Sequence, residues 1–445
     1  MSEATDARDR YLSEYEQQSA SSFGAPVAWL RRLRQEAAEI LRDQGFPTTR
    51  DEEWRFTPLA PLLSVPFARG EYSPNGLRRP AFAPLGFEGL DCHELVFVNG
   101  HLAVGLSSLG DLPKGVTVMS LKRALSERPE ELEEHLGRAV DPKANPFVAL
   151  NTSLSQDGAY IRLARGVRVP KPIHLLFVSA SHGEPSASHP RVLVVADEGS
   201  HATLLESYGG LGETPYFTNA VTEVVVAPNA QVDHAKIQRE TEAAYHVATL
   251  QVAQAGDSTF SSTSISLGGA LTRNNVNVVL GGEGIESSLN GLYMARGSQL
   301  VDNHTLIDHA KPHCNSHEFY KGVLDDRSRG VFNGKVYVRL DAQKTDAKQT
   351  NQNLLLSDDA SVNAKPQLEI FADDVKCTHG ATVGQLDETA VFYLRTRGIG
   401  EAQARSILTY AFANEIVERI KVEPVRAALS ELLLSRDLHG AVVRR

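Results

Sequence analysis

The fold is decided by a stretch near the middle of the chain, VTEVVVAPNA (residues 221–230), in which an apolar run ends at a corner of small residues. The β-branched run Val221–Val226 favours a strand, and Ala227-Pro228-Asn229-Ala230 is typical of a turn. The same unit occurs upstream, where Val192–Val195 is followed by Ala196-Asp197-Glu198-Gly199. Consecutive early units lie roughly 25–32 residues apart, which is the spacing expected for the coils of a solenoid.

Similar short β-branched runs continue on both sides of this stretch, and helical spacing is absent from about residue 150 to about residue 387. The other runs are Tyr160–Leu163, Ile173–Val178, Val276–Leu280, Val336–Leu340 and Leu368–Phe371. A sandwich or barrel would favour tight two-residue hairpins, which are scarce here. Small residues at the corners favour a parallel β-helix, in which successive coils stack as rungs.

The two ends of the chain are predicted to be helical. Residues 26–43 carry an apolar stripe at helical spacing, and Asn99-Gly100 between apolar runs indicates a small hairpin. Further helices are expected near 120–127, 129–138, 387–396, 401–420 and 424–435. The predicted domains are therefore an N-terminal, mostly helical region (1–150), a β-helix core (151–386) and a C-terminal helical region (387–445).

The composition excludes several classes of protein. The net charge of −10 argues against non-specific binding to nucleic acid, which needs a basic surface, and weakly against docking on an anionic membrane. Three cysteines in 445 residues do not make a disulfide framework and suit a reducing compartment. The chain starts with acidic residues and lacks an apolar segment there, so we expect no secretion signal. It contains no stretch of about 18 apolar residues, so we expect no membrane-spanning helix. We expect a cytoplasmic protein.

A cysteine and a histidine near the end of the predicted core could carry chemistry, in Cys377-Thr378-His379. Residues two apart on a strand point to the same side, and an imidazolium beside a thiol can stabilise the thiolate. The pair could serve as a nucleophile or as soft metal ligands, but two ligands do not close a four-ligand site. Further ligands would have to come from another segment or another chain. A structural pair at a strand end explains the residues equally well.

A second cluster contains four histidines and a cysteine between residues 302 and 318, of which the candidate ligands are His309, His313 and Cys314. Their spacing matches no common metal motif, and alternation along a strand would send the side chains to opposite faces. Polar residues outside the corners of a β-helix are the alternative. Paired aspartates such as Asp325-Asp326 fit turns, although they leave open a β-helix enzyme acting on polysaccharide. No phosphate-binding loop is present.

The stretch from about Lys335 to Ile420 resembles the SufB/SufD family of iron–sulfur cluster assembly proteins. The matching segments are 345–349, 353–357, 366–370, 372–384 (ADDVKCTHGATVG) and 392–399 (FYLRTRGI). Upstream, residues 309–314 and the loop DEEWRFT (residues 51–57) are also similar to the family. Gly380, directly after His379, is similar to the SufD branch, because SufB-type sequences tend to have glutamate there.

The resemblance implies a right-handed parallel β-helix between N- and C-terminal helical domains. It implies a scaffold without catalytic activity of its own, which pairs with SufB through the β-helices and holds the SufC ATPase through C-terminal helices. A nascent iron–sulfur cluster would form at the SufB–SufD interface, with His379 as a ligand and Cys377 as a secondary candidate. The ATPase would contact the apolar face Ala404, Ile407, Leu408 and Ala411. A homodimer of the isolated chain and a weaker link to reduced flavin are also implied.

Overall fold

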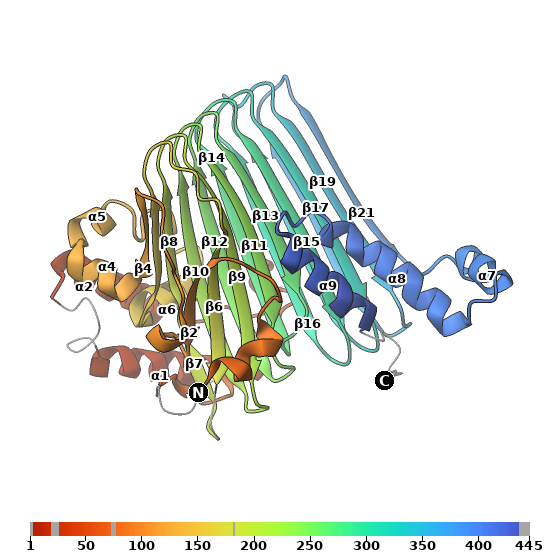
Figure 1. The fold of residues 1–445 in the computed structure, drawn as a ribbon, viewed down its shortest axis with the longest axis horizontal. Helices are drawn as coiled ribbons and strands as arrows, with labels where there is room; N and C mark the ends of the chain where they lie inside the picture. Colours follow the sequence, from red (N-terminus) through yellow and green to blue (C-terminus); the bar gives the residue numbers. More distant parts are fainter. Residues whose placement is uncertain (1–2, 19–25, 73–76, 181–182, 436–445) are drawn as a thin grey trace.

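The computed structural model describes residues 3–18, 26–72, 77–180 and 183–435. The chain is mainly β and forms a β-solenoid of about eight turns, flanked by helices from both ends of the chain (Figure 1). The predicted fold class, a parallel β-helix between helical regions, is confirmed. The last ten residues of the predicted C-terminal region lie outside the described residues.

Alternate strands of the solenoid form two sheets. The first sheet runs in the order β20 (Ser361–Ile370), β18 (Arg329–Val338), β16 (Leu300–His309), β14 (Leu271–Leu280), β12 (Ala244–Gln254), β10 (Tyr216–Val226), β8 (Arg191–Ala196), β5 (Gly158–Leu163) and β4 (Val116–Ser120), with β1 (Ala68–Arg69) and β7 (Ser186–Ser188) beside it. The second runs in the order β21 (Lys376–Gly384), β19 (Asp346–Leu355), β17 (Asn315–Leu324), β15 (Glu286–Ala295), β13 (Thr259–Ser266), β11 (Gln231–Arg239), β9 (His201–Leu211), β6 (Ile173–Ala180), β2 (His93–Val98) and β3 (His101–Leu102).

Each strand of the core pairs in parallel with the strand one coil away. Gln231 lies beside His201 on one side and beside Thr259 on the other, spacings of 30 and 28 residues. The repeat predicted around residues 221–230 is therefore the length of one coil. Val224 and Val226 face the interior, and the next residues form the corner, where Asn229 adopts φ 58°.

Most core strands are longer than the β-branched runs that indicate them. The run Val276–Leu280, for example, is only the second half of β14, whose first half reads Leu-Thr-Arg-Asn-Asn. The buried Thr272 and Asn274 belong to that first half. Polar residues are tolerated there because parallel pairing satisfies the backbone and neighbouring side chains bond to one another. The apolar pattern therefore marked the existence of the strands but not their starts.

Helices cover the outer faces of the two sheets. On the first sheet lie α1 (Glu3–Gln18), α2 (Ala28–Gln44), α3 (Ala60–Leu63) and α6 (Pro146–Leu154), together with α4 (Leu121–Glu127) and α5 (Pro129–Glu133). On the second sheet α8 (Glu401–Val417) packs against β15 and β17, and α9 (Glu423–Ser435) packs beside α8 in the same apolar cluster (Figure 1). Helix α1 was not predicted, because its stripe of apolar residues is short: Ala7, Tyr11 and Leu12 are buried.

The short helical turns follow local signals. Turn η1 (Glu52–Trp54) lies in the loop after α2, η2 (Arg79–Leu85) in the proline-rich segment, and η3 (Val104–Leu106) after the predicted hairpin. That hairpin is β2 and β3, paired antiparallel around Asn99 (φ 51°) and Gly100 (φ 83°). Helix α7 (Glu388–Thr396) begins at Asp387, whose side chain accepts from the Thr389 amide, and it extends beyond the last coil (Figure 1).

Candidate functional site

The last coil of the solenoid leaves an edge open on each sheet. Among the described residues, β20 pairs only with β18 and β21 only with β19, so each strand has one side without a described neighbour. Three large apolar side chains are exposed there: Phe371 at 53%, Val383 at 50% and Ile370 at 39%. Exposed strand edges readily pair with another chain. The open backbone and the exposed apolar side chains therefore lie together at this end of the solenoid.

Cys377 and His379 both lie on β21, at this open end. They are two residues apart and belong to the same face, and they pair in register with Ala347 and Gln349 of β19. Cys377 is half-buried against the apolar cluster that includes Val336. Burial raises the pKa of its thiol, which a backbone hydrogen bond at Ala347 only partly offsets. The free chain therefore holds Cys377 as a protonated thiol rather than an activated thiolate.

His379 is exposed, and the space beside it is open. A Cβ added at the following Gly380 would meet nothing within 4 Å. The backbone therefore does not require glycine here, and a side chain at this position would extend from the face of β21 opposite to His379. In the described part of the chain, neither Cys377 nor His379 belongs to a group of three or more potential metal ligands within 4.8 Å of one another. A metal held here would need ligands from elsewhere.

A polar column runs under His379 into the solenoid. The register places Gln349 beneath His379 and Glu318 beneath Gln349, and Gln349 Nε2 donates to Glu318 Oε2 at 2.7 Å. Gln349 Oε1 is buried without a hydrogen-bond partner. Burial raises the pKa of Glu318 to about 7. The interior below the candidate site is thus a chain of polar groups whose innermost carboxyl titrates near neutrality.

The histidine cluster between residues 302 and 318 is divided by the fold. His309 points into the solenoid, where its Nε2 lies 2.9 Å from Ser316 Oγ and burial lowers its pKa to about 4. His313 is an exposed corner residue with φ 59°. Cys314 is buried, donates to Gly282 O at 3.2 Å, and has a thiol pKa raised by burial. The structure does not bring these three predicted ligands together.

Of the four residues predicted to contact the ATPase, some are buried or half-buried and others are exposed. Ala404 is fully buried, Leu408 is half-buried, and Ile407 and Ala411 are exposed on the outer side of α8. The buried side of α8 consists instead of Ala404, Thr409, Ala413, Ile416 and Val417. Beside the outer side, α7 exposes Phe392 at 64% and Tyr393 at 57%. The sequence pattern alone did not separate the two sides, because both carry apolar residues.

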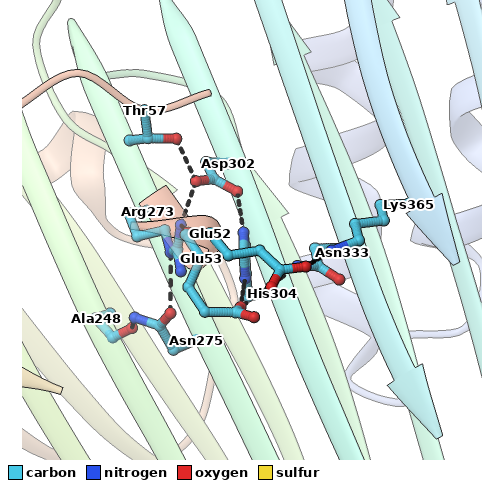
Figure 2. A network of polar contacts seen from close by, with 10 residues as sticks. All are labelled: Glu52, Glu53, Thr57, Ala248, Arg273, Asn275, Asp302, His304, Asn333 and Lys365. Carbon is cyan, nitrogen blue, oxygen red and sulfur yellow. Dashed lines mark hydrogen bonds and ion pairs between the residues drawn. The ribbon is translucent and has the colours of Figure 1, made fainter. Parts of the chain in front are cut away.

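The loop of residues 49–57 forms a polar network on the outer face of the first sheet (Figure 2). His304 lies between two carboxylates, with Nδ1 3.0 Å from Glu53 Oε2 and Nε2 3.1 Å from Asp302 Oδ1. Arg273 Nη1 donates to Asp302 at 2.5 Å and to the Glu53 carbonyl at 2.8 Å. The hydrogen bond from His304 lowers the pKa of Glu53. These contacts fasten the N-terminal region to strands β14 and β16.

Trp54 adds apolar contacts to the polar ones that hold this loop against the first sheet. Trp54 is buried, with its ring centroid 5.3 Å from that of Phe147 and Arg273 Cζ 4.3 Å from its ring centroid. A cavity of about 870 Å³ remains between the loop and strands β16, β18 and β20, lined by residues that include Arg50, Asn333 and Lys365. Sequence reasoning found this loop only by resemblance, because its polar partners Arg273, Asp302 and His304 are more than 200 residues away.

Comparison with known proteins agrees with this architecture. Residues 177–412 match the family model for the SufBD core domain of SUF-system FeS cluster assembly, and residues 5–175 match that for the SufBD N-terminal region. The chain is 35% identical to an iron–sulfur cluster assembly SufBD family protein of Synechocystis over 97% of this chain and 96% of that protein.

Two relatives carry the name of the SufD branch. The chain is 36% identical to the iron–sulfur cluster assembly protein SufD of Escherichia coli over 89% of this chain and 90% of that protein. It is 26% identical to the SufD protein of Bacillus subtilis over 91% and 93%. None of the described helices combines the length and apolar character that crossing a bilayer requires. The matches span both the helical N-terminal region and the solenoid, and the chain belongs to the SufB/SufD family of iron–sulfur cluster assembly proteins, on its SufD side.

Proposed function

We propose that this chain is a non-catalytic scaffold subunit, on which an iron–sulfur cluster forms at the interface with a second, SufB-type solenoid. The observation that carries the proposal is the open end of the solenoid, where two unpaired strand edges and exposed apolar side chains surround Cys377 and His379. A second solenoid that continued the two sheets would satisfy the open backbone groups. It would also bring its own side chains next to the pair.

The ligand set supports a shared site rather than a site within one chain. His379 is exposed and can rotate toward a partner, whereas Cys377 is half-buried and protonated in the free chain. We therefore assign His379 as the principal ligand from this chain and Cys377 as the secondary one. Cys377 would join only if the partner changed its surroundings, because a thiol must lose its proton to bind iron. The cluster is the cargo of the complex.

We also propose that the exposed side of the C-terminal helices docks the SufC ATPase. Phe392, Tyr393 and Ile407 are exposed although they are large and apolar, and the absence of a phosphate-binding loop means that nucleotide hydrolysis would come from another chain. Within the predicted docking set, Ile407 and Ala411 can reach a partner directly. Ala404 instead supports the packing of α8. The free cysteines are consistent with a cytoplasmic location.

The cluster site is tested by replacing His379 with alanine and co-expressing the variant with the SufB-type and ATPase subunits. We expect the complex to assemble, because His379 is exposed and supports no packing, but to carry less iron, less sulfide and less visible cluster absorption. Cys377→Ser should have a smaller effect. His317→Ala is the matched control, because His317 is also an exposed histidine on the second sheet. An undiminished cluster yield in the His379 variant would remove the assignment.

The ATPase surface is tested separately with Phe392→Ser and Ile407→Ser, each in the otherwise intact chain. We expect weaker co-purification of the ATPase, with unchanged stability of the isolated subunit, because both side chains are exposed. Exposed Leu434 on α9 provides a control, since Leu434→Ser changes an apolar residue outside the proposed surface. Retention of the ATPase by both variants would exclude this surface as the docking site.

A further inference from the structure

Three side chains of metal-binding type meet far from the open end. One ligand atom each from Cys92, Glu94 and His174 lies within 4.8 Å of the other two. Within the described ranges this is the one group of three or more such residues that is so close. It lies on the outer face of the second sheet, at the coil that begins the solenoid. Neither the proposed cluster site nor the cavity at residues 49–57 includes any of these residues.

The backbone fixes the relative positions of the three residues. Cys92 immediately precedes β2 and is two residues from Glu94, so the two side chains extend to the same side. Strand β2 pairs in parallel with β6, and the register sets Glu94 beside His174. Val96 and Leu176, the next outward residues on each strand, are buried in an apolar cluster. Glu94 and His174 therefore stand on two paired strands, and Cys92 is held next to them by the residue that begins β2.

The neighbours of these residues are arranged as they would be around a bound cation. His174 Nε2 lies 2.9 Å from Ser207 Oγ, and Nδ1 lies 3.1 Å from Glu94 Oε1. Without an ion, Nδ1 donates to Glu94. With an ion bound, the ring proton would be on Nε2 and would be donated to Ser207, and Nδ1 would present its lone pair to the ion. Metal-bound histidines characteristically use the second ring nitrogen in this way. Arg79 bonds to the other oxygen of Glu94, which leaves Oε1 directed at the histidine.

One of the three side chains is buried and another is accessible to solvent. His174 is almost completely buried, with the Phe87 ring centroid 5.9 Å from its own, while Cys92 is half-exposed and offers access from solvent. Burial and the nearby Glu94 carboxylate raise the pKa of the Cys92 thiol to about 12. A bound cation would displace that thiol proton to solvent. With a thiolate, a carboxylate and a neutral imidazole, a divalent ion would be fully balanced in charge.

We propose that Cys92, Glu94 and His174 bind one divalent ion of the zinc type, with water as the fourth ligand. The mixture of sulfur, nitrogen and oxygen ligands suits Zn²⁺ or Co²⁺ and does not suit Ca²⁺ or Mg²⁺, which prefer oxygen. The ion would tie the segment from Arg79 to Cys92 to the first coil of the second sheet. This site is independent of the proposed cluster site, because it lies at the other end of the solenoid.

The probe is Co²⁺ added to the full-length, metal-free chain, because a cobalt–thiolate bond has a charge-transfer absorption in the near ultraviolet. We expect the absorption to saturate at one equivalent in the wild type and to disappear when Zn²⁺ is added. Cys92→Ser should lose the absorption while keeping the circular dichroism of the wild type. Ser207→Ala should keep it but bind Co²⁺ about 10–100-fold more weakly, because Ser207 orients the histidine.

Cys377→Ser is the matched control, since Cys377 is also a half-buried cysteine and stands at the opposite end of the solenoid. It should bind Co²⁺ as the wild type does. Absence of the thiolate absorption in the wild type would overturn the proposal. So would its persistence in Cys92→Ser or its loss in Cys377→Ser. Because none of these measurements requires a partner or a cluster, failure here leaves the proposed function unaffected, and the converse also holds.

Discussion

The two ends of the solenoid finish the same pair of sheets in different ways. At the start, β4 turns antiparallel against β5, β3 turns antiparallel against β2, and helices cover the outer faces. At the finish, β20 and β21 remain parallel and have one side unpaired in the described part of the chain; β21 is largely exposed and β20 is half-buried. Reversing strand direction ends a parallel stack within one chain. The end without such a reversal is where we propose that a second molecule binds, and Cys377 and His379 lie there.

The interiors of the two ends differ as well. Around the first coils the inward side chains are apolar, as in Phe97, Ile161 and Phe177. Toward the open end the buried inward positions of β19 include Gln349, Asn351 and Asn353, which bond to neighbouring coils or to one another. Amides satisfied in this way stabilise less than buried hydrocarbon. The closed end should therefore supply most of the stability of the isolated chain.

The largest expected effect is at the closed end, in Arg191→Met. Arg191 Nη2 lies 2.6 Å from Glu223 Oε1, and both side chains are almost fully buried. Removing the arginine leaves a buried, uncompensated carboxylate, which costs about 3–5 kcal/mol of unfolding free energy. Urea denaturation of the isolated chain measures this. Arg165→Met, which removes an exposed partner of Glu198, is the control and should cost less than about 1 kcal/mol.

Next in size is Glu318→Gln, which tests whether the polar interior near the open end weakens the fold. The pKa of Glu318 is raised from 4.5 to about 7 in the folded chain. The folded state therefore holds its proton longer than the unfolded state, and stability falls as pH rises from 4.5 through 7. The wild type should lose about 3 kcal/mol across this range. The variant should not, so parallel pH profiles of unfolding free energy for the two proteins would contradict this account.

These differences explain what the sequence could and could not predict. Corners such as residues 227–230 and the β-branched runs predicted the solenoid and the coil length, because both depend on local chemistry. The starts of the strands were hidden, since positions such as Asn274 and Gln349 are polar and nevertheless buried. Between residues 302 and 318 the side chains do alternate between the two faces of a strand as expected: His304 is on the outer face and His309 points inward. No local signal indicates that Glu94 lies beside His174 or Glu53 beside His304, because 80 and 251 residues separate them.

A smaller effect is expected at Asp302, on the outer face of β16, where the N-terminal loop is attached. Burial raises the pKa of Asp302, but the charge of Arg273 and the interactions with His304 and Thr57 outweigh it and lower the pKa from 3.8 to about 2. The folded pKa is the lower one, so this stabilisation is complete above 3.8 and is lost as pH falls toward 2. It amounts to about 2 kcal/mol.

Asp302→Asn should therefore lower the unfolding free energy at neutral pH. It should also make the unfolding free energy less dependent on pH in the acidic range. Denaturant titrations at several pH values would measure both effects. Asp308→Asn is the control on the same strand, because the partner of Asp308 is Arg339, whose side chain is 53% exposed to solvent. It should change stability by less than about 1 kcal/mol. Equal responses of the two variants would mean that the loop contributes no more than a surface ion pair.

The smallest effect on stability, and the sharpest contrast between the ends, is expected for Val383→Lys on β21. Val383 is 50% exposed at the open edge, so the isolated chain should change by no more than about 0.5 kcal/mol. A charged edge residue opposes strand pairing, so binding to the proposed SufB-type partner should weaken strongly. Calorimetry of the isolated chain and size-exclusion chromatography of the pair separate these outcomes. Val104→Lys, at an exposed valine near the closed end, should leave both unchanged. If Val383→Lys also left pairing intact, the partner would have to cover another surface, and the open end would be a feature of the fold alone.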